Sequence, residues 1–267
     1  MRVWLVTGAA RGFGKELVRQ ALAEGDAVVA TARDPRRFDF GSHERLLTLA
    51  QDVTDEQRAA EVADAALARF GRIDVLVSNA GSGLLGAVEE TTLAQARAVF
   101  ETNVFGLLAV TRAVLRGQRS GHLVALSSMG GFASGAGFGV YAASKFAVEG
   151  LHEALAEELA PFGVRVTIVE PGGFATGFGH GSARTEPIAD YALPRYDGPI
   201  DGHDPVWGVA RIRDRRCGCR SVRTRSAGSA PNSPRFARNS TPCQAHVTNR
   251  SQFLPRPEMG LKTRRVR

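Results

Sequence analysis

A tyrosine and a lysine stand four residues apart at Tyr141 and Lys145, so that on a helix both side chains project from one face. A lysine charge about 4 Å from a phenolate, at an effective dielectric near 20, is worth roughly 4 kcal/mol, or about three pKa units. Leaving aside desolvation, which acts in the opposite direction on tyrosine, this predicts a pKa of Tyr141 near neutrality, suited to exchanging a proton with a substrate oxygen. The alternative is an exposed ring and a solvated lysine on an ordinary helix.

A serine, Ser128, precedes this pair by thirteen residues and follows an apolar run typical of a strand. At the carboxyl end of a strand its hydroxyl can hydrogen-bond a substrate carbonyl, so we expect it to orient the substrate rather than attack it. A hydrolase that uses Ser128 as nucleophile is a remote alternative, because no G-x-S-x-G elbow surrounds it and no histidine is suitably placed by motif.

Glycines cluster in residues 7–14, immediately after the apolar run of residues 3–6. Such glycines permit a tight turn and let the backbone approach a pyrophosphate at a helix N-terminus, where the helix dipole favours negative charge. The spacing is G-x-x-x-G-x-G rather than G-x-G-x-x-G, so a plain strand-to-helix turn is the alternative.

The elements that would position these residues alternate along the first 175 residues. Continuous apolar runs predict buried strands, and apolar residues at helical spacing predict helices between them. The expected strands are residues 3–6, 27–31, 46–50, 73–77, 123–126 and 164–169, and the expected helices are residues 14–24, 55–70, 93–115 and 141–160. This order predicts an α/β fold of Rossmann type, a doubly wound parallel sheet in one domain that binds ligands beyond the carboxyl ends of its strands.

With these motifs in this order, the sequence resembles the short-chain dehydrogenase/reductase family over residues 1 to about 176. The family's nucleotide turn T-G-x-x-x-G-x-G matches residues 7–14. The other matching motifs are Asp52-Val53, Asn79-Ala80-Gly81, Asn103, Ser127-Ser128, Tyr141-Ala-Ala-Ser-Lys145 and Pro171-Gly172-Gly173.

The resemblance implies hydride transfer between a nicotinamide cofactor and a ketone, aldehyde or secondary alcohol of moderate size, as in ketoreductases and in hydroxysteroid or retinol dehydrogenases. It implies that Tyr141 is the general acid or base, that Ser128 orients the substrate and that Asn103 holds a water that relays protons through Lys145. It also implies that Asn79 stabilises the sheet beside the cofactor and that Thr176 contacts the nicotinamide carboxamide. The expected cofactor-binding residues are Gly8, Arg11, Gly12, Phe13, Gly14, Arg33, Asp52, Val53, Asn79, Ala80, Gly81, Tyr141, Lys145, Pro171, Gly172 and Thr176.

Two arginines favour NADP over NAD. The position where an acid would bind the ribose 2′-hydroxyl of NAD is Ala32, followed by Arg33, and Arg11 lies in the glycine turn. Guanidinium groups form charge-assisted, often bidentate bonds to phosphate. NAD remains an alternative because Asp34 comes next, and Arg33 could also be a solvated surface charge.

The composition changes sharply near residue 205. Residues 1–205 contain 19 Lys and Arg against 25 Asp and Glu, whereas residues 206–267 contain 15 against 2, so the overall net charge of +7 describes neither part. We therefore expect a dehydrogenase domain at residues 1–205, with its C-terminal elements incomplete, and an Arg-rich disordered tail at residues 206–267 that does not match the family.

Three hypotheses compete for this tail. It could bind nucleic acid through phosphates, but Phe236 and Phe253 are the only aromatic residues in its arginine-rich part, residues 211–267, so base stacking is not supported. Cys217, Cys219, Cys243 and His246 could bind zinc, but their spacing is unusual, and we expect no metal. We favour an out-of-frame translation that replaces the native C-terminus, to be tested by resequencing the coding DNA. The alternative function is then a protein that binds NADP but is catalytically impaired.

Location and partners follow from composition. All three cysteines lie after residue 205, which fits a reducing, cytoplasmic setting for the domain. Arg112 interrupts the best candidate for a membrane span, residues 104–115, so we expect no membrane. The expected partner is a small-molecule carbonyl or alcohol substrate; a homo-oligomer is left open, and a nucleic-acid partner is not favoured.

Overall fold

The computed structural model describes residues 1–172, 176–191, 193 and 211–214 of the 267-residue chain. The chain divides into two units, Met1–Pro231 and Asn232–Arg267, and the second lies wholly outside the described residues. The three cysteines and His246, considered above as zinc ligands, also lie outside them.

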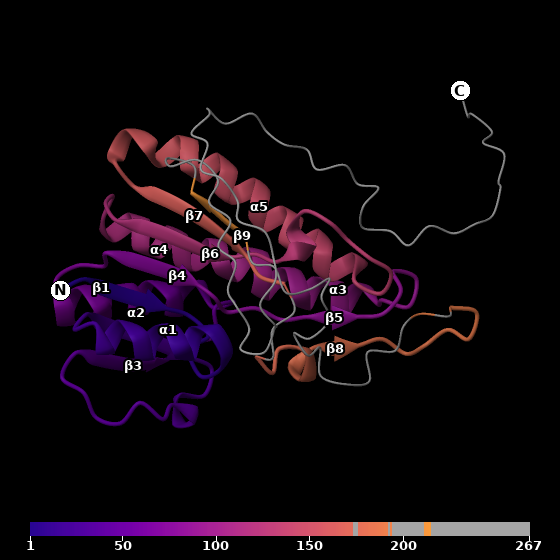
Figure 1. Ribbon diagram of the computed structural model, residues 1–267, viewed down its shortest axis with the longest axis horizontal. Coiled ribbons are helices and arrows are strands. Elements are labelled where there is room, and N and C mark those ends of the chain that lie inside the picture. Colours follow the sequence, from indigo (N-terminus) through magenta and orange to yellow (C-terminus); the bar gives the residue numbers. More distant parts are fainter. Residues whose placement is uncertain (173–175, 192, 194–210, 215–267) are drawn as a thin grey trace, which may run out of the picture. The chain divides into compact units, whose positions relative to one another are not determined.

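The described part of the chain is built on one seven-stranded sheet in the order β3-β2-β1-β4-β6-β7-β9 (Figure 1). Neighbouring strands are parallel except that β9 is antiparallel to β7. The strands are β1 (Val3–Val6), β2 (Ala27–Ala32), β3 (Leu46–Ala50), β4 (Val75–Ser78), β6 (His122–Leu126), β7 (Arg165–Glu170) and β9 (Arg211–Asp214). The strand order reverses between β1 and β4, which opens a crevice at the carboxyl ends of these strands. The predicted α/β fold is confirmed.

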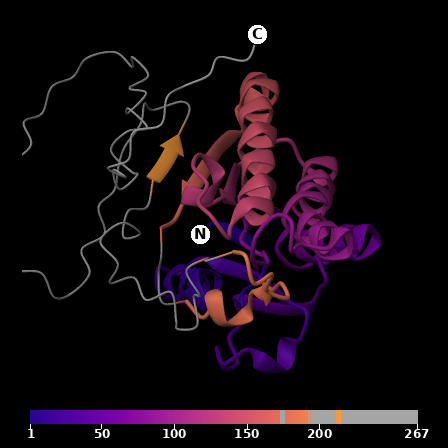
Figure 2. The ribbon, with the colours of Figure 1, turned by 90° about the vertical axis from the view of Figure 1, so that its right-hand side faces the viewer.

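Helices cover both faces of the sheet. They are α1 (Gly12–Ala23), α2 (Glu56–Phe70), α3 (Leu93–Phe100), α4 (Leu107–Gly117) and α5 (Gly139–Leu159), with the π-helical turn η2 (Glu101–Gly106) between α3 and α4. The larger core lies under α2, α4 and α5, where Val62, Val110 and Leu159 pack with Leu5 of β1. The smaller core lies under α1, where Val18 packs with strand residues. Figure 2 shows α5 standing beside the helical stretch from α3 to α4.

Local sequence signals set the ends of these helices. The Asp55 side chain accepts a hydrogen bond from the amide of Arg58 and so caps α2, which ends at Gly71 in the left-handed region, with φ 77°. Thr92 and Gln95 form a capping box at the start of α3. The predicted helix at residues 93–115 is therefore present, but a π-helical turn in its middle carries Asn103.

The helical stretch Leu93–Gly117 is the one segment of the described chain that is long and apolar enough to cross a membrane. About half of it, 56% of the apolar window, is buried inside the fold. Val110 and Val114 of α4 contribute to the larger core, so this stretch has the burial of a core helix.

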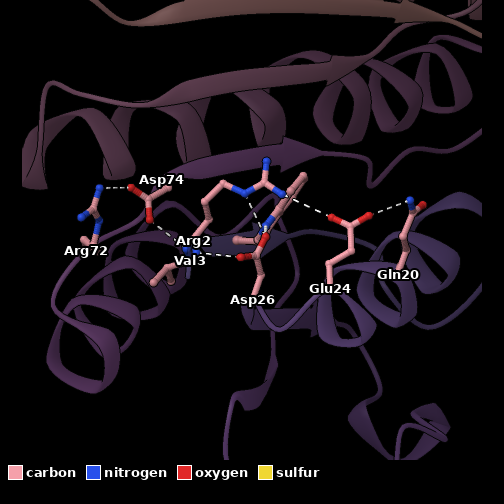
Figure 3. A network of polar contacts seen from close by, with 8 residues as sticks. Arg2, Val3, Gln20, Glu24, Asp26, Arg72 and Asp74 are labelled. Atoms are coloured by element: carbon pink, nitrogen blue, oxygen red, sulfur yellow. Dashed lines mark hydrogen bonds and ion pairs between the residues drawn. The ribbon is translucent and has the colours of Figure 1, made fainter.

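A polar network joins the amino-terminal ends of β1, β2 and β4, opposite the crevice (Figure 3). The carboxylate of Asp26 accepts hydrogen bonds from the Arg2 amide at 2.7 Å, the Arg2 guanidinium at 2.9 Å and the Trp4 indole at 2.9 Å. Asp74 accepts from the Val3 amide at 2.8 Å. Burial by itself raises the pKa of Asp26, but these hydrogen bonds and the Arg2 charge together lower it.

Three strands were not anticipated from the sequence. β5 (Leu84–Leu85) and β8 (Ala183–Arg184) form a separate two-stranded parallel sheet, and two residues are too few to give a periodic signal. β9 lies inside the predicted tail, and its backbone pairs with β7. The rest of residues 206–267 lies outside the described chain.

Candidate active site

Two adjoining cavities lie at the carboxyl ends of the strands. The first, about 170 Å³, contains Ser128, Tyr141 and Lys145 in its wall. The second, about 470 Å³, is bounded by the glycine turn and by the ends of β2 and β3. Both cavities include Phe13, Asn79, Gly81, Thr176 and Phe178 in their walls, so they form one groove.

The glycine turn is held against the end of β4 by Asn79. The Asn79 side-chain amide donates to the carbonyl of Thr7 at 2.9 Å and to that of Gly8 at 3.0 Å. Gly8 has φ 65°, and a Cβ there would lie 2.9 Å from the Cα of Ala80. A Cβ on Gly14 would lie 2.5 Å from Nδ2 of Asn79 and 2.7 Å from the Gly8 carbonyl oxygen. The turn therefore requires glycine at both positions.

Ser128 and Tyr141 face the first cavity from different elements. Ser128 follows β6 and caps the short turn η3 (Met129–Gly131), where its Oγ accepts from the Gly130 amide at 3.0 Å. Tyr141 lies in the first turn of α5, and its ring lies 5.7 Å from the ring of Phe178, centroid to centroid. The fold thus brings together two side chains that the chain separates by a loop.

Burial raises the pKa of Tyr141 to about 12, because the phenolate would lose its hydration; a hydrogen bond with Ser128 acts in the opposite direction. The predicted pKa near neutrality is therefore not produced by the chain's own residues. The causes of this shift are burial and the Ser128 hydrogen bond; the Lys145 Nζ lies 5.9 Å from the centroid of the Tyr141 ring and donates to the Leu126 carbonyl at 2.8 Å. Desolvation therefore outweighs the lysine charge.

Lys145 is itself buried, with 5% of its surface exposed. Burial lowers its pKa to about 8, and the charge of Glu149 acts in the opposite direction. Both ionisable groups of the cavity thus have strongly perturbed pKa values, which is common at functional sites.

Asn103 lies behind Gly81 rather than in the wall of either described cavity. Its Nδ2 donates to the Ser82 carbonyl at 2.9 Å and to the Ser144 hydroxyl at 3.0 Å, and its Oδ1 accepts from the Ser82 amide at 2.8 Å. A Cβ on Gly81 would lie 3.3 Å from Oδ1 of Asn103 and 3.8 Å from Nζ of Lys145, so the two polar groups flank the same glycine.

Arginines line the far end of the second cavity. Arg11, Arg33 and Arg37 contribute to its wall together with Asp34. The Asp34 carboxylate is engaged by Arg36 at 2.8 Å and 3.1 Å, and hydrogen bonds from Arg36 hold the pKa of Asp34 below its usual range. Arg11 donates to the Gly177 carbonyl at 3.2 Å and so also contacts the segment that follows β7.

Glu90 holds the segment 176–191, part of which lines the two cavities. The Glu90 carboxylate accepts from the amides of Ala87 at 2.7 Å and Ile188 at 2.9 Å, and from the Thr185 hydroxyl at 2.8 Å. The Ile188 and Thr185 bonds place this segment, with Phe178, beside the first cavity.

The structure gathers the expected catalytic and cofactor-binding residues into this groove, except Gly14 and Asn103, which lie behind its wall. Gly173 of the predicted Pro171-Gly172-Gly173 motif lies outside the described residues. Sequence reasoning missed Phe138 and Phe178 in the first cavity and Gln51, Thr102 and Arg37 in the second. Gln51 is 3% exposed, and its side-chain amide has no hydrogen-bond partner within the described chain. Its place directly before Asp52 was the signal that could have found it.

Comparison with known proteins gives consistent results. The family model for short chain dehydrogenases matches residues 2–187. The oxidoreductase BOA17 of Botryotinia fuckeliana is 37% identical over 197 residues, which cover 71% of this chain and 72% of that protein. The 3-ketodihydrosphingosine reductase of Bacteroides thetaiotaomicron is 39% identical over 180 residues, which cover 66% of this chain and 65% of that one. The chain thus spans about two thirds of the length of these relatives.

Solved structures show the same similarity. A short-chain dehydrogenase from Streptomyces avermitilis is 48% identical, with a TM-score of 0.67 over 72% of this chain and 75% of that one. ElxO with NADP bound is 30% identical, with a TM-score of 0.62 over 66% and 75% of the two chains. A short-chain dehydrogenase/reductase from Burkholderia phymatum in complex with NAD is 30% identical, with a TM-score of 0.63 over 67% and 68%.

Proposed function

The chain belongs to the short-chain dehydrogenase family, and on this premise we propose that it is an NADPH-dependent oxidoreductase that interconverts a ketone or aldehyde and an alcohol. The observation that carries this proposal is that Ser128, Tyr141 and Lys145 share one cavity, which continues into the groove along the glycine turn. The expected substrate is a small molecule of moderate size.

The residues of the second cavity fit a dinucleotide. Gly8 and Gly12 have positive φ, and a Cβ on Gly12 would lie 3.0 Å from the Cβ of Thr176, so the glycines keep room for a close approach of the backbone to a pyrophosphate. Similar structures hold NADP and NAD. When bound, the nicotinamide ring supplies or accepts the hydride.

Charge at the ribose end favours NADP. Asp34, the group that would favour NAD, is engaged by Arg36, whereas Arg11, Arg33 and Arg37 add positive charge to the same wall. Replacing Arg33 with alanine should therefore weaken NADPH binding by about tenfold or more while leaving NADH binding nearly unchanged. Fluorescence titration with the two cofactors measures this, and equal losses for both would contradict NADP selection by Arg33.

Tyr141 is the proton donor of the proposed reduction. With a pKa of about 12 its phenol stays protonated at neutral pH, so it can transfer a proton to the oxygen that receives negative charge. The Ser128 Oγ accepts from the Gly130 amide and is hydrogen-bonded with Tyr141, so the two hydroxyls lie together where a substrate oxygen would bind both. Lys145 holds its position through the Leu126 carbonyl and supplies positive charge behind the tyrosine.

The test uses the full chain with NADPH and a panel of ketones, aldehydes and quinones. Tyr141→Phe removes the acidic proton with little change in shape and should lower kcat/KM by about 10² to 10⁴ while NADPH still binds. Tyr191→Phe is the matched control, because Tyr191 is 41% exposed and its hydroxyl contacts Glu89 outside the two cavities. NADPH binding with no turnover across the panel would instead support the alternative, a cofactor-binding protein that is catalytically impaired.

A further inference from the structure

A row of ionisable side chains continues from the first cavity down the inner side of α5. Tyr141, Lys145 and Glu149 follow one another at four-residue intervals, and His152 stands one turn further. Lys145, Glu149 and His152 are 5%, 8% and 1% exposed. Residues four apart lie on one helix face, so the carboxylate of Glu149 is the next ionisable group behind the lysine.

The carboxylate of Glu149 lies against the turn that carries Ser128. A Cβ on Gly131 would lie 2.7 Å from Oε1 of Glu149 and 3.0 Å from its Cγ, and it would also collide with the Oγ of Ser127. Gly131 ends η3, the turn capped by Ser128. Glu149 therefore fills the space that a larger residue at position 131 would take.

The Lys145–Glu149 pair also has an electrostatic consequence. A buried ammonium is costly unless an opposite charge lies near it. Burial lowers the pKa of Lys145 to about 8, and the charge of Glu149 is what opposes this fall. The lysine charge acts along the same row: burial is the main cause that lowers the pKa of His152, and Lys145 lowers it further.

Other elements that pack on α5 carry few charged groups within the described chain. Those elements are η3, β5, β6, β7, η2, α3, α4 and the turn η4 (Ala160–Phe162). Their ionisable side chains are the buried Glu170 and the exposed Arg165 of β7, the half-buried His122 of β6, the exposed Arg112 and Arg116 of α4, the exposed Glu101 of η2 and the exposed Arg97 of α3. Glu149 is the one among all these groups that contributes to the pKa of Lys145.

We propose that Glu149 is a positioning residue that keeps Lys145 in its charged form at neutral pH and supports, through Gly131, the turn that holds Ser128. The proposal rests on the proposed function for the role of Lys145, but its central test needs no turnover.

The chain has only three lysines, Lys15, Lys145 and Lys262, so protein labelled with ¹³C at the lysine Cε gives three NMR signals. Lys145→Met assigns the signal of Lys145 by its loss. In Glu149→Gln the Lys145 signal should titrate about 1 pH unit or more below its wild-type midpoint. In the control Glu157→Gln, an exposed position on the same helix, the midpoint should not move. An unchanged midpoint in Glu149→Gln would overturn the proposal.

The pH profile of kcat/KM gives a second readout. If Lys145 must be charged, activity falls as the pH rises through its pKa, and in Glu149→Gln this fall should begin at lower pH. Glu149→Asp keeps the charge and should restore the profile toward that of the wild type. A uniform loss of activity at every pH would mean that Glu149 is only structural. If the wild-type chain itself shows no turnover, the proposed function fails, while the NMR titration still decides the role of Glu149.

Glu149→Gln could also prevent folding, and a double variant then decides. In Glu149→Gln the buried Lys145 ammonium has lost the opposite charge of Glu149. The double variant Lys145→Met/Glu149→Gln removes this unpaired ammonium as well and should restore a folded chain. A double variant that stays unfolded would show that packing of Glu149, not its charge, matters, and would overturn the proposal.

Discussion

The same substitution, glycine to alanine inside a helix, should have opposite effects at Gly14 and Gly150. Alanine is the better helix former by about 1 kcal/mol at an unhindered position. Gly150 is exposed on α5, and a Cβ there would meet no atom within 4 Å. Gly150→Ala should therefore stabilise the protein by up to about 1 kcal/mol.

At Gly14 the cost of the close contacts made by an added Cβ exceeds the gain in helix propensity. The new Cβ would lie 2.5 Å from Nδ2 of Asn79 and 2.7 Å from the Gly8 carbonyl oxygen. Loss of the two hydrogen bonds from Asn79 to the turn costs about 2 kcal/mol, and forced packing costs about 1 kcal/mol or more. After the helix gain is allowed for, Gly14→Ala should lower the free energy of unfolding by about 2 kcal/mol.

Urea unfolding followed by circular dichroism measures both variants at one pH. Because Gly14 belongs to the cofactor turn, Gly14→Ala should also weaken NADPH binding by about tenfold, equal to about 1.4 kcal/mol, whereas Gly150→Ala should leave it unchanged. Adding Asn79→Ala removes the atom that lies nearest to the new Cβ, so the double variant should lose less stability than the sum of the single losses. A Gly14→Ala protein as stable as the wild type, with unchanged NADPH affinity, would refute the close packing of this turn.

Three further predictions concern other parts of the fold. Asp26→Asn should lower the free energy of unfolding by about 1 to 2 kcal/mol, mostly through weaker hydrogen bonds, because Arg2 is half exposed and its charge contributes little. Since the pKa of Asp26 is lowered in the folded protein, the stability difference between wild type and variant should be full above about pH 4 and should shrink as the pH falls through that lowered pKa. Urea unfolding at several pH values measures this difference. Glu90→Gln should speed amide hydrogen exchange at residues 183–188 and raise the KM for the carbonyl substrate without changing the Kd of NADPH. Hydrogen bonds from Ile188, Thr185 and Ala87 lower the pKa of Glu90, so in the wild type these contacts should persist until the pH falls below the usual pKa of a glutamate. Gly71→Ala should cost about 1 kcal/mol in thermal or urea unfolding, because Gly71 ends α2 with φ 77° and an added Cβ is strained there despite open space; an unchanged midpoint would contradict this.

The fold could be predicted because its signals are local. A buried parallel strand is a continuous apolar run, and a covering helix carries apolar residues at helical spacing. Six strands and the helices between them were found in this way, with ends that differ from the structure by at most two residues. β5 and β8 were missed because two-residue strands have no period, and β9 because its composition alone predicts disorder.

The sequence by itself determined which residues meet at the carboxyl edge of the sheet, since motifs that follow successive parallel strands necessarily converge there. It could not determine the balance of forces on them. The spacing of Tyr141 and Lys145 predicted a lowered tyrosine pKa, but the packing around them buries both groups and gives the ammonium to the Leu126 carbonyl, so desolvation dominates. Likewise, Asp34 in the sequence favours NAD, but in the structure its carboxylate is engaged by Arg36. Spacing fixes which groups are neighbours, whereas pKa values and charge at a site depend on burial and on partners that only the tertiary structure supplies.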